Sequence, residues 1–380
     1  MRESYFFHTE NLTVGYDGKP LIREIEIRVR QGEILTLIGP NGAGKSTILK
    51  SITRQLKTIA GTVWLDKEDM KRLSDKEVSR KLSVVMTERI RPELMTCEDV
   101  VATGRYPYTG HLGILSGKDR EIVREAMELV HAWELKDRDF TAISDGQRQR
   151  LLLARAIAQE PEIIVLDEPT SFLDIRHKLE LLGILKRMVR ERKLTVVMSL
   201  HELDLAQKVS DSVICVKGDR IAKYGKPEEI FTEDYIHELY DMSAGSYNEA
   251  FGSLELEPPE GPAETFVIAG GGSGIPIYRR LQRKGIPFYT GVLHKNDVDY
   301  QVAKVLARET VAEEAFEPIS EKQYAHALEN MMKCRTVIAA VKEFGTMNEK
   351  NRILLEEAQK AGMEILDGDR EYWEKGSKGK

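Results

Sequence analysis

The chain has 380 residues, which is long for a single hydrophobic core and predicts two domains. With 41% hydrophobic and 31% charged residues, it has the composition of an ordinary soluble globular protein. A formal net charge of -6 argues against a nucleic-acid-binding protein, which is normally basic, so no nucleic-acid partner is expected.

Neither a targeting segment nor a membrane span is expected. Residues 2–8 are too few and too polar for a signal peptide, and no apolar stretch approaches the roughly 18 residues that cross a bilayer. Cys97, Cys215 and Cys334 are far apart and form no C-x-x-C pair, so we interpret them as buried thiols in a reducing cytoplasm. A role at a membrane would therefore require another chain to supply the membrane part.

The first part of the chain alternates strand and helix patterns. Residues 25–30 alternate apolar and polar side chains, as in a half-buried strand, and residues 34–38 form a continuous apolar run typical of a fully buried one. Residues 119–133 have helical periodicity, and further apolar runs follow at 163–166 and 194–200. This alternation predicts an α/β fold with a largely parallel sheet.

A linker is predicted at residues 257–264, where prolines, glycine and acidic residues crowd together. The first domain is therefore expected to span residues 1–256 and the second residues 265–380. Apolar runs at 265–269 and 336–341 predict that the second domain is a smaller, Rossmann-like α/β unit.

A phosphate-binding loop directly follows the buried strand at 34–38. The sequence matches G-x-x-x-x-G-K-[ST] between a strand and a helix, the context that this motif requires. Glycines let backbone N–H groups turn toward phosphates, Lys45 neutralises them, and the Ser46 hydroxyl can hold Mg²⁺. The predicted nucleotide-binding residues are Gly39, Pro40, Asn41, Gly42, Ala43, Gly44, Lys45, Ser46 and Thr47.

Two carboxylates follow the apolar run at 163–166. Asp167 and Glu168 would lie at the carboxyl edge of the sheet, where α/β proteins bind ligands. Asp167 suits the orientation of Mg²⁺, and Glu168 suits the role of general base for the attacking water. The alternative, a solvated strand end, is disfavoured by the phosphate-binding loop in the same chain.

Residues 143–147 read Ile-Ser-Asp-Gly-Gln and resemble the LSGGQ signature of ABC ATPases. Ile143 replaces the leucine and Asp145 replaces the first glycine. Taken alone, the segment could be a capped helix with Ser144 as its N-cap. The resemblance instead implies that the signature contacts ATP on the opposite subunit of a homodimer, through Ser144, Asp145, Gly146 and Gln147.

Other elements of the same family follow in order. Asp174 is similar in position to the D-loop aspartate, and His201 to the switch histidine that contacts the γ-phosphate. Tyr16 falls where an aromatic ring stacks on adenine, although an ordinary turn tyrosine is an alternative. The family has a metal-contacting glutamine near residue 87, where this chain offers Thr87 or Glu88 as the oxygen ligand.

The resemblance covers about residues 5–256 and extends to one group of transporters. Residues 104–108 read Gly-Arg-Tyr-Pro-Tyr and look like the G-R-x-P-H stretch of ATPases from siderophore, haem and cobalamin importers, with Tyr108 for His. A generic helix end broken by Gly104 and Pro107 is the alternative. The resemblance implies an α/β P-loop NTPase of the ABC type with a helical subdomain at about residues 92–160.

By the same resemblance, ATP and Mg²⁺ are the expected cofactors. The expected partners are a second copy of the chain, a polytopic permease and a substrate-binding protein, with the ATPase in the cytoplasm on the inner face of the membrane. Two other functions stay open. One is a soluble ABC ATPase acting on a cytoplasmic assembly or a cofactor-maturation client, and the other is a regulatory switch with slow hydrolysis.

The second domain carries only a weak ligand signal. Residues 269–274 are glycine-rich after a strand, but the third glycine of G-x-G-x-x-G is missing, so close packing or a regulatory small-molecule site are both compatible with them. His294, Asp297 and Asp299 could ligate a metal, but a solvated loop is the favoured interpretation.

Overall fold

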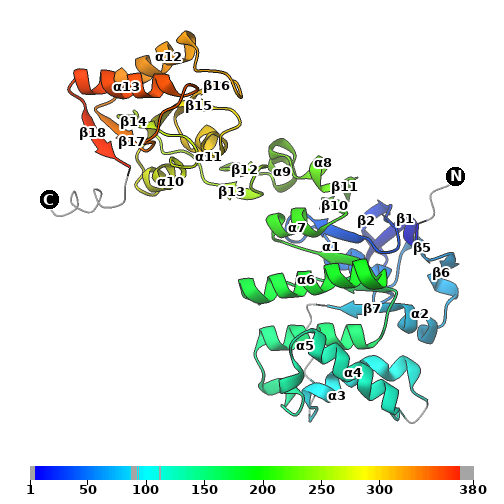
Figure 1. Ribbon diagram of the computed structural model, residues 1–380. Helices are drawn as coiled ribbons and strands as arrows, with labels where there is room; N and C mark the ends of the chain where they lie inside the picture. Colours follow the sequence, from blue (N-terminus) through cyan, green and yellow to red (C-terminus); the bar gives the residue numbers. More distant parts are fainter. Residues whose placement is uncertain (1–4, 87–91, 93, 111–112, 369–380) are drawn as a thin grey trace. The chain divides into compact units, whose positions relative to one another are not determined.

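The computed structural model describes residues 5–86, 92, 94–110 and 113–368, and divides into two compact units, Met1–Asp241 and Met242–Lys380 (Figure 1). The boundary predicted at residue 256 therefore falls inside the second unit. A hairpin of β12 (Ser246–Asn248) and β13 (Ser253–Glu255) precedes the proline-rich segment. It belongs to the second unit because Asn248 donates a hydrogen bond of 2.8 Å to the Gln301 carbonyl and Glu255 is paired with Arg279.

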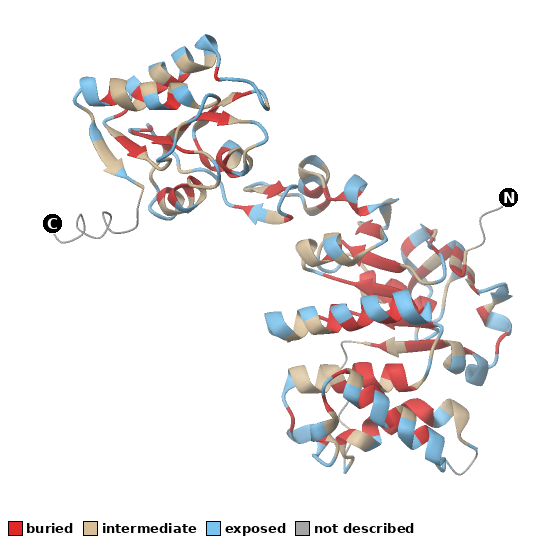
Figure 2. Ribbon diagram, viewed as in Figure 1, coloured by how far each residue is buried: buried red, intermediate tan, exposed pale blue. Residues whose placement is uncertain are grey.

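The central layer of the first unit is a six-stranded sheet in the order β11-β10-β4-β9-β8-β7, parallel except for β11. Its middle strands are apolar and buried on both faces, as Figure 2 shows in red, which is why they read as continuous apolar runs. The strands are β4 (Ile34–Ile38), β7 (Leu82–Val85), β8 (Ile163–Leu166), β9 (Thr195–Ser199), β10 (Ser212–Lys217) and β11 (Arg220–Gly225).

An antiparallel sheet in the order β2-β1-β5-β6, with β3 paired to β1, forms a second layer. Its strands are β1 (Phe7–Tyr16), β2 (Lys19–Ile25), β3 (Arg28–Val29), β5 (Ala60–Leu65) and β6 (Glu68–Asp69). The single strand predicted at 25–30 is wrong, because β2 ends at Ile25 and β3 is a separate short strand, although the alternating burial is present. One core joins apolar residues of both sheets with those of α1 (Lys45–Ile52), so the helix after the phosphate loop is held between two layers.

Between β7 and β8 the chain forms a helical segment with three capped α-helices. Thr96, Ser116 and Ser144 each accept a backbone N–H at N3 while the N3 side chain bonds back to the cap, which fixes where each helix begins. These helices are α3 (Cys97–Ala102), α4 (Gly117–Leu129) and α5 (Asp145–Ala158), with 3₁₀ turns η2 (Thr103–Tyr108), η3 (Trp133–Leu135) and η4 (Phe140–Ala142).

The remaining helices of the first unit include the two that follow β8 and β9, α6 (Ile175–Arg192) and α7 (Leu203–Val209). The others are η1 (Met70–Arg72), α2 (Asp75–Lys81), α8 (Pro227–Ile230) and α9 (Glu233–Tyr240). Across the described residues of both units, no helix is long and apolar enough to span a bilayer.

The second unit is a five-stranded parallel sheet in the order β16-β15-β14-β17-β18, with a separate apolar core on each face. This order, in which the chain moves outward from β14 first one way and then the other, is that of a doubly wound Rossmann-like domain, so the predicted fold class is confirmed. Its elements are β14 (Thr265–Ile268), α10 (Ile275–Arg283), β15 (Phe288–His294), α11 (Val298–Leu306), β16 (Glu309–Glu313), α12 (Glu321–Met332), β17 (Thr336–Ala339), α13 (Glu349–Lys360) and β18 (Glu364–Asp367).

Candidate nucleotide site

The phosphate loop joins the end of β4 to the first turn of α1. Gly39 and Gly44 have positive φ angles of 143° and 93°, and a Cβ atom would lie 2.1 Å from the Val216 carbonyl oxygen at Gly39 and 2.6 Å from Ile22 at Gly44. Both positions therefore need glycine. The loop ends at an α-helix N-terminus, where unpaired N–H groups favour an anion.

Lys45 is the cation of this loop, and only 5% of it is exposed. Its Nζ donates to the carbonyls of Gly39 at 2.7 Å and Pro40 at 3.1 Å. Burial lowers the pKa of Lys45, and the negative charges of Glu168 and Asp167 oppose that shift. A buried ammonium beside backbone N–H groups fits a phosphate, which would supply the compensating charge.

The two predicted carboxylates follow β8 and are arranged around one hydroxyl of β9. Ser199 Oγ donates to Asp167 Oδ1 at 2.7 Å and accepts the backbone N–H of Glu168 at 2.9 Å. Glu168 itself has a φ of 47°, which turns its side chain out of the line of the strand. Ser199 is thus a positioning residue, and its place inside an apolar strand gave no separate signal in the sequence.

His201 and Glu168 come from neighbouring strands and are brought together. His201 Nε2 hydrogen-bonds Glu168 Oε1, and the Ser171 hydroxyl donates to Glu168 Oε2 at 3.2 Å. The carboxylate thus has one oxygen toward a histidine and the other toward a serine, which holds it in place as a hydrogen-bond acceptor for water.

Further polar groups that the sequence did not single out support this edge of the sheet. Glu202 accepts from Thr170 at 2.8 Å and from Lys178 at 2.5 Å, which ties the segment after His201 to α6. The Tyr240 hydroxyl accepts the Gly39 N–H at 3.2 Å, and burial raises the pKa of Tyr240 to about 12. Tyr240 is 201 residues from Gly39, so no local motif could have revealed the contact.

Tyr16 ends β1 beside the phosphate loop. Its hydroxyl lies 3.2 Å from the Thr47 hydroxyl, and half of the residue is exposed. The ring is thus anchored at its hydroxyl end and has an open face. This geometry is compatible with stacking on a base, and the predicted adenine contact stays a prediction.

The signature segment forms the start of α5, as the capped-helix alternative required. Ser144 is the N-cap and accepts the Gln147 N–H at 3.3 Å, while Asp145 is paired with Arg148 at 2.5 Å. Gly146 leaves space at the helix start, since a Cβ there would meet nothing closer than 3.5 Å. The contact of these residues with ATP on a second subunit stays a prediction.

The D-loop aspartate, Asp174, is the N-cap of α6. Its carboxylate accepts the His177 N–H at 2.9 Å, and this backbone hydrogen bond is the main cause of the lowered pKa of Asp174. Of the predicted metal ligands, Ser46 follows Lys45 after the phosphate loop and Asp167 directly follows β8. The other two candidates, Thr87 and Glu88, lie outside the described residues.

Residues 104–108, which favoured the chelate importers, lie in η2, and Arg105 ties this turn to α4 and to the end of α5. Arg105 is 4% exposed and donates to Asp119, to the Ala158 carbonyl and to Glu160, while its guanidinium lies 4.1 Å from the Tyr108 ring centroid. Arg105 is thus engaged inside the unit, whereas its neighbour Tyr106 is 58% exposed.

In the second unit, the glycine loop is filled by the chain's own carboxylates. Asp299 is buried and accepts the N–H groups of Gly274 and Ile275 at 3.0–3.1 Å, and Asp297 accepts that of Gly271 at 2.8 Å. Burial raises the pKa of Asp299. The interpretation as a solvated loop is therefore wrong for Asp299, and the described residues contain no group of three or more potential metal ligands.

Comparisons with known proteins support the interpretation of this site as a nucleotide site. The model of the ABC transporter family matches residues 22–171, and a family named MJ0874 matches residues 288–377. The chain is 41% identical over 286 residues to an uncharacterised ABC transporter ATP-binding protein, MJ0873, of Methanocaldococcus jannaschii, covering 75% of this chain and 99% of the relative.

Two further relatives have assigned substrates. The iron(3+)-hydroxamate import ATP-binding protein FhuC of Bacillus subtilis is 36% identical, over 62% of this chain and 88% of its own. The cobalamin import ATP-binding protein BtuD of Halobacterium salinarum is 32% identical, over 77% of this chain and 75% of its own.

Solved structures of ABC transporter proteins are also similar to this chain. A metal-chelate type ABC transporter in an inward-facing conformation matches with a TM-score of 0.55 and 26% identity, over 62% of this chain and 89% of its own. The dimeric ATP-binding cassette MJ0796 bound to ADP and Pi matches with a TM-score of 0.52 and 26% identity, over 58% and 98%. The chain thus belongs to the ABC transporter ATP-binding proteins, which hydrolyse ATP.

Proposed function

We propose that this protein powers a membrane importer for a metal chelate of the iron-siderophore or cobalamin type. The observation that carries the proposal is the assembled edge of the sheet, where Lys45, Asp167, Glu168 and His201 meet, in a chain whose relatives include importers of both kinds of chelate. The alternative of a soluble ATPase with a cytoplasmic client has no relative in its favour among those compared.

The residues at this edge of the sheet have different roles in ATP hydrolysis. Lys45 and the loop N–H groups bind the phosphates, and the Ser46 hydroxyl with the Asp167 carboxylate provides the oxygen ligands that Mg²⁺ prefers. Such a metal would neutralise charge on the phosphates. Glu168 accepts a proton from the attacking water, and His201 and Ser171 hold that carboxylate in place.

Dimerisation completes each site. By family analogy, Ser144, Gly146 and Gln147 of one copy approach ATP held on the phosphate loop of the other, so that ATP closes the dimer and hydrolysis reopens it. This motion would alternate the access of a permease at the inner face of the membrane.

A groove between the sheet and the helical segment is the proposed docking site for that permease. It encloses about 580 Å³ and is lined by Gln55, Val85, Met86, Leu152 and Arg155, among others. Its lining mixes apolar side chains with the polar groups of Gln55, Ser79, Arg155 and Gln159, which suits a short amphipathic helix of a partner.

The test is a pull-down of tagged Glu168→Gln protein from native membranes with Mg-ATP, read by mass spectrometry. A polytopic permease and its substrate-binding protein should be recovered, and the binding protein would identify the chelate. The matched control adds Gln55→Trp, which puts a larger side chain at an exposed residue of the groove lining. It should lose the permease and keep the ATP-dependent dimer. Recovery of soluble partners alone would contradict the importer function.

A further inference from the structure

A second concave site lies at the end of the first unit opposite the nucleotide. It is a cleft of about 360 Å³ between the last turns of α6 and the segment that joins α7 to β10. Ile34, the first residue of β4, lines it, whereas the phosphate loop follows the last residue of that strand, Ile38. The cleft is therefore separate from the site described above.

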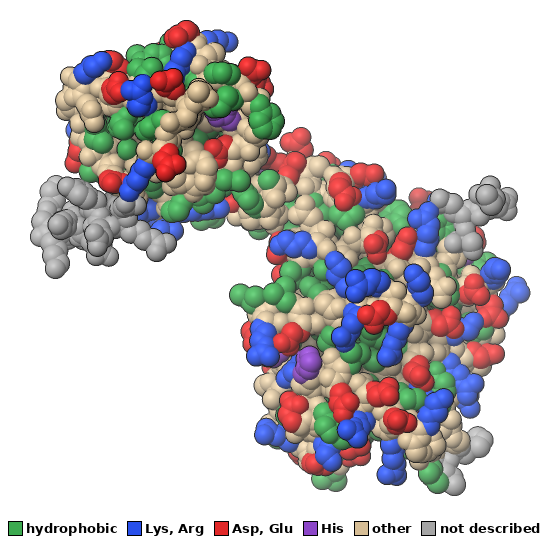
Figure 3. Space-filling view, in the orientation of Figure 1, with side chains coloured by type: hydrophobic (Ala, Val, Ile, Leu, Met, Phe, Trp, Pro, Cys, Tyr) green, Lys and Arg blue, Asp and Glu red, His purple; other side chains and the backbone are tan. Residues whose placement is uncertain are grey.

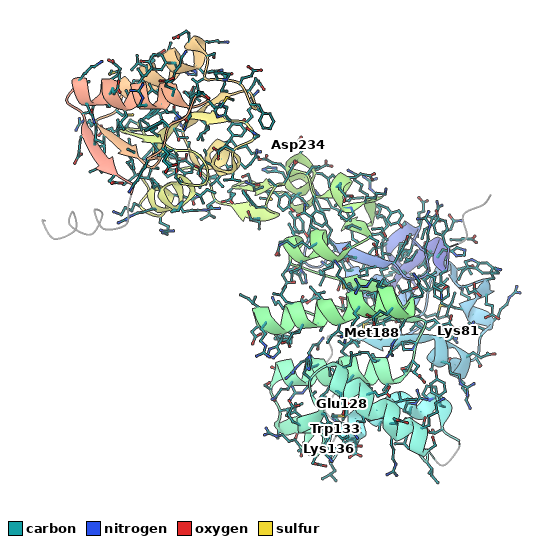
Figure 4. The ribbon with its side chains drawn as sticks, viewed as in Figure 1. Lys81, Glu128, Trp133, Lys136, Met188 and Asp234 are labelled. Carbon is teal, nitrogen blue, oxygen red and sulfur yellow. The ribbon has the colours of Figure 1, made fainter. Side chains whose placement is uncertain are left out.

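The lining of this cleft is basic, although the chain as a whole has a net charge of -6. Four cationic side chains line it, from Lys186, Arg187, Arg190 and Lys208, against a single carboxylate, Asp211. Figure 3 shows blue side chains gathered over α6, and in Figure 4 the label Met188 marks this half of the helix.

Most of this positive charge has no ion-pair partner among the described residues, and Lys186 donates to the Lys208 carbonyl at 3.3 Å. Asp211 uses one carboxylate oxygen to accept the Ile34 N–H at 2.7 Å, and Lys208 is paired with Asp204 at 3.2 Å. Among the described residues, Arg187 and Arg190 form no ion pair. Basic residues near a helix C-terminus are favoured by the helix dipole, but that effect does not account for their convergence on a cleft.

The lining of the cleft includes an exposed glycine that the fold does not require. Gly183 lies in the middle of α6, where glycine costs about 1 kcal/mol relative to alanine. It has no positive φ angle, and a Cβ atom there would meet nothing within 4 Å. The missing side chain keeps the cleft open beside the cations.

We propose that this cleft binds a compact, phosphate-bearing anion. The planar guanidinium groups of Arg187 and Arg190 match phosphate oxygens bidentately, and Lys186 and Lys208 add charge from both walls. The cleft also lies between the C-terminal parts of α6 and α7, whose N-terminal ends lie at the candidate nucleotide site. Helix α6 begins after Asp174, and α7 begins after His201. A bound anion would thus hold both helices at once.

The test is calorimetric titration of inorganic tripolyphosphate into full-length protein whose phosphate loop is saturated with Mg-ADP. Wild type should bind at one site, and the double substitution Arg187→Gln with Arg190→Gln should weaken binding about tenfold or more, because two charge-assisted contacts are lost. The matched control, Arg176→Gln with Arg192→Gln, removes the same charge from α6 outside the cleft and should bind as wild type does.

A second variant separates loss of binding from loss of folding. Gly183→Leu should fold at least as stably as wild type, since it replaces a helical glycine where space is open, yet it should block binding. Binding should also slow hydrogen exchange of the α7 amides in wild type and not in the double variant.

Vesicles distinguish the source of the phosphate. Cosedimentation with phosphatidic acid but not phosphatidylcholine vesicles, lost in the double variant, would identify a lipid headgroup, whereas tripolyphosphate binding alone would identify a soluble ligand. The proposal is overturned if neither probe binds, if the double variant binds as well as wild type, or if polyglutamate alone binds in a variant-sensitive way.

Discussion

Ser199 holds the two acidic residues of the site through a single hydroxyl. It donates to Asp167 and accepts from the Glu168 backbone, and it is itself fully buried. We expect Ser199→Ala to lower the rate of ATP hydrolysis about tenfold while ATP affinity stays within a factor of a few, because the lost hydrogen bond positions Asp167 and Glu168 rather than the nucleotide. Steady-state kinetics would show a fall in kcat with KM nearly unchanged. A rise in KM alone would assign Ser199 to binding.

Glu168→Gln keeps the size of the side chain and removes its basicity. The rate of hydrolysis should fall by about 10²–10⁴, whereas Mg-ATP binding and ATP-dependent dimerisation should persist. Rapid-quench measurement of a single turnover would separate chemistry from product release. Turnover at the wild-type rate would remove Glu168 from the mechanism.

Residues that occupy a recognisable motif were predictable from the sequence, whereas Ser199 and Tyr240, which reach the site without one, were not. Lys45 and Glu168 each follow a buried strand within a recognisable motif, so their chemistry could be inferred from spacing. Ser199 and Tyr240 reach the same site from β9 and α9, and a serine inside an apolar strand or a tyrosine near a helix end has no local signature.

The turn from β4 into α1 depends on glycines of two different kinds. Gly42 and Gly44 both have positive φ angles, but a Cβ would meet open space at Gly42 and Ile22 at Gly44. Gly42→Ala should therefore cost about 1–2 kcal/mol from backbone strain alone, whereas Gly44→Ala should cost more and weaken ATP binding further. Urea unfolding and nucleotide titration of the two variants would check this order. Equal losses would show that backbone strain alone matters.

The sequence predicted which strands and helices exist better than it predicted the residues at which they begin and end. The buried strands β4 and β8 have the predicted bounds, because a continuous apolar run ends abruptly where the polar loop begins. The segment at 25–30 does not form one strand, because β1 pairs with β2 through Ile25 and with β3 through Val29. Partner choice of this kind depends on register between distant strands, which the alternation of side chains does not encode.

The described residues form two units with separate cores, and the candidate nucleotide site lies in the first. The second is stabilised in part by Glu313, whose pKa is lowered to about 2, mainly by hydrogen bonds from Ser320 and also from the Glu314 N–H. Because the folded-state pKa lies below the ordinary 4.5, this stabilisation is complete above pH 4.5. It is lost as the pH falls from about 4.5 toward 2.

Calorimetry of the full chain should therefore show two transitions with different sensitivities. Saturating Mg-ADP should raise the Tm of the first unit only, by an amount equivalent to about 2.7 kcal/mol at 100 times Kd. Glu313→Gln should lower the Tm of the second unit by several degrees at pH 7 and by progressively less as the pH falls from 4.5 toward 2, because the Glu313 carboxyl is then protonated in the unfolded wild-type chain and increasingly protonated in the folded one. Glu317→Gln makes the same charge change at an exposed position nearby and should leave both transitions in place. A shift of the first transition by Glu313→Gln, or of the second by Mg-ADP, would show instead that the two units unfold as one cooperative body.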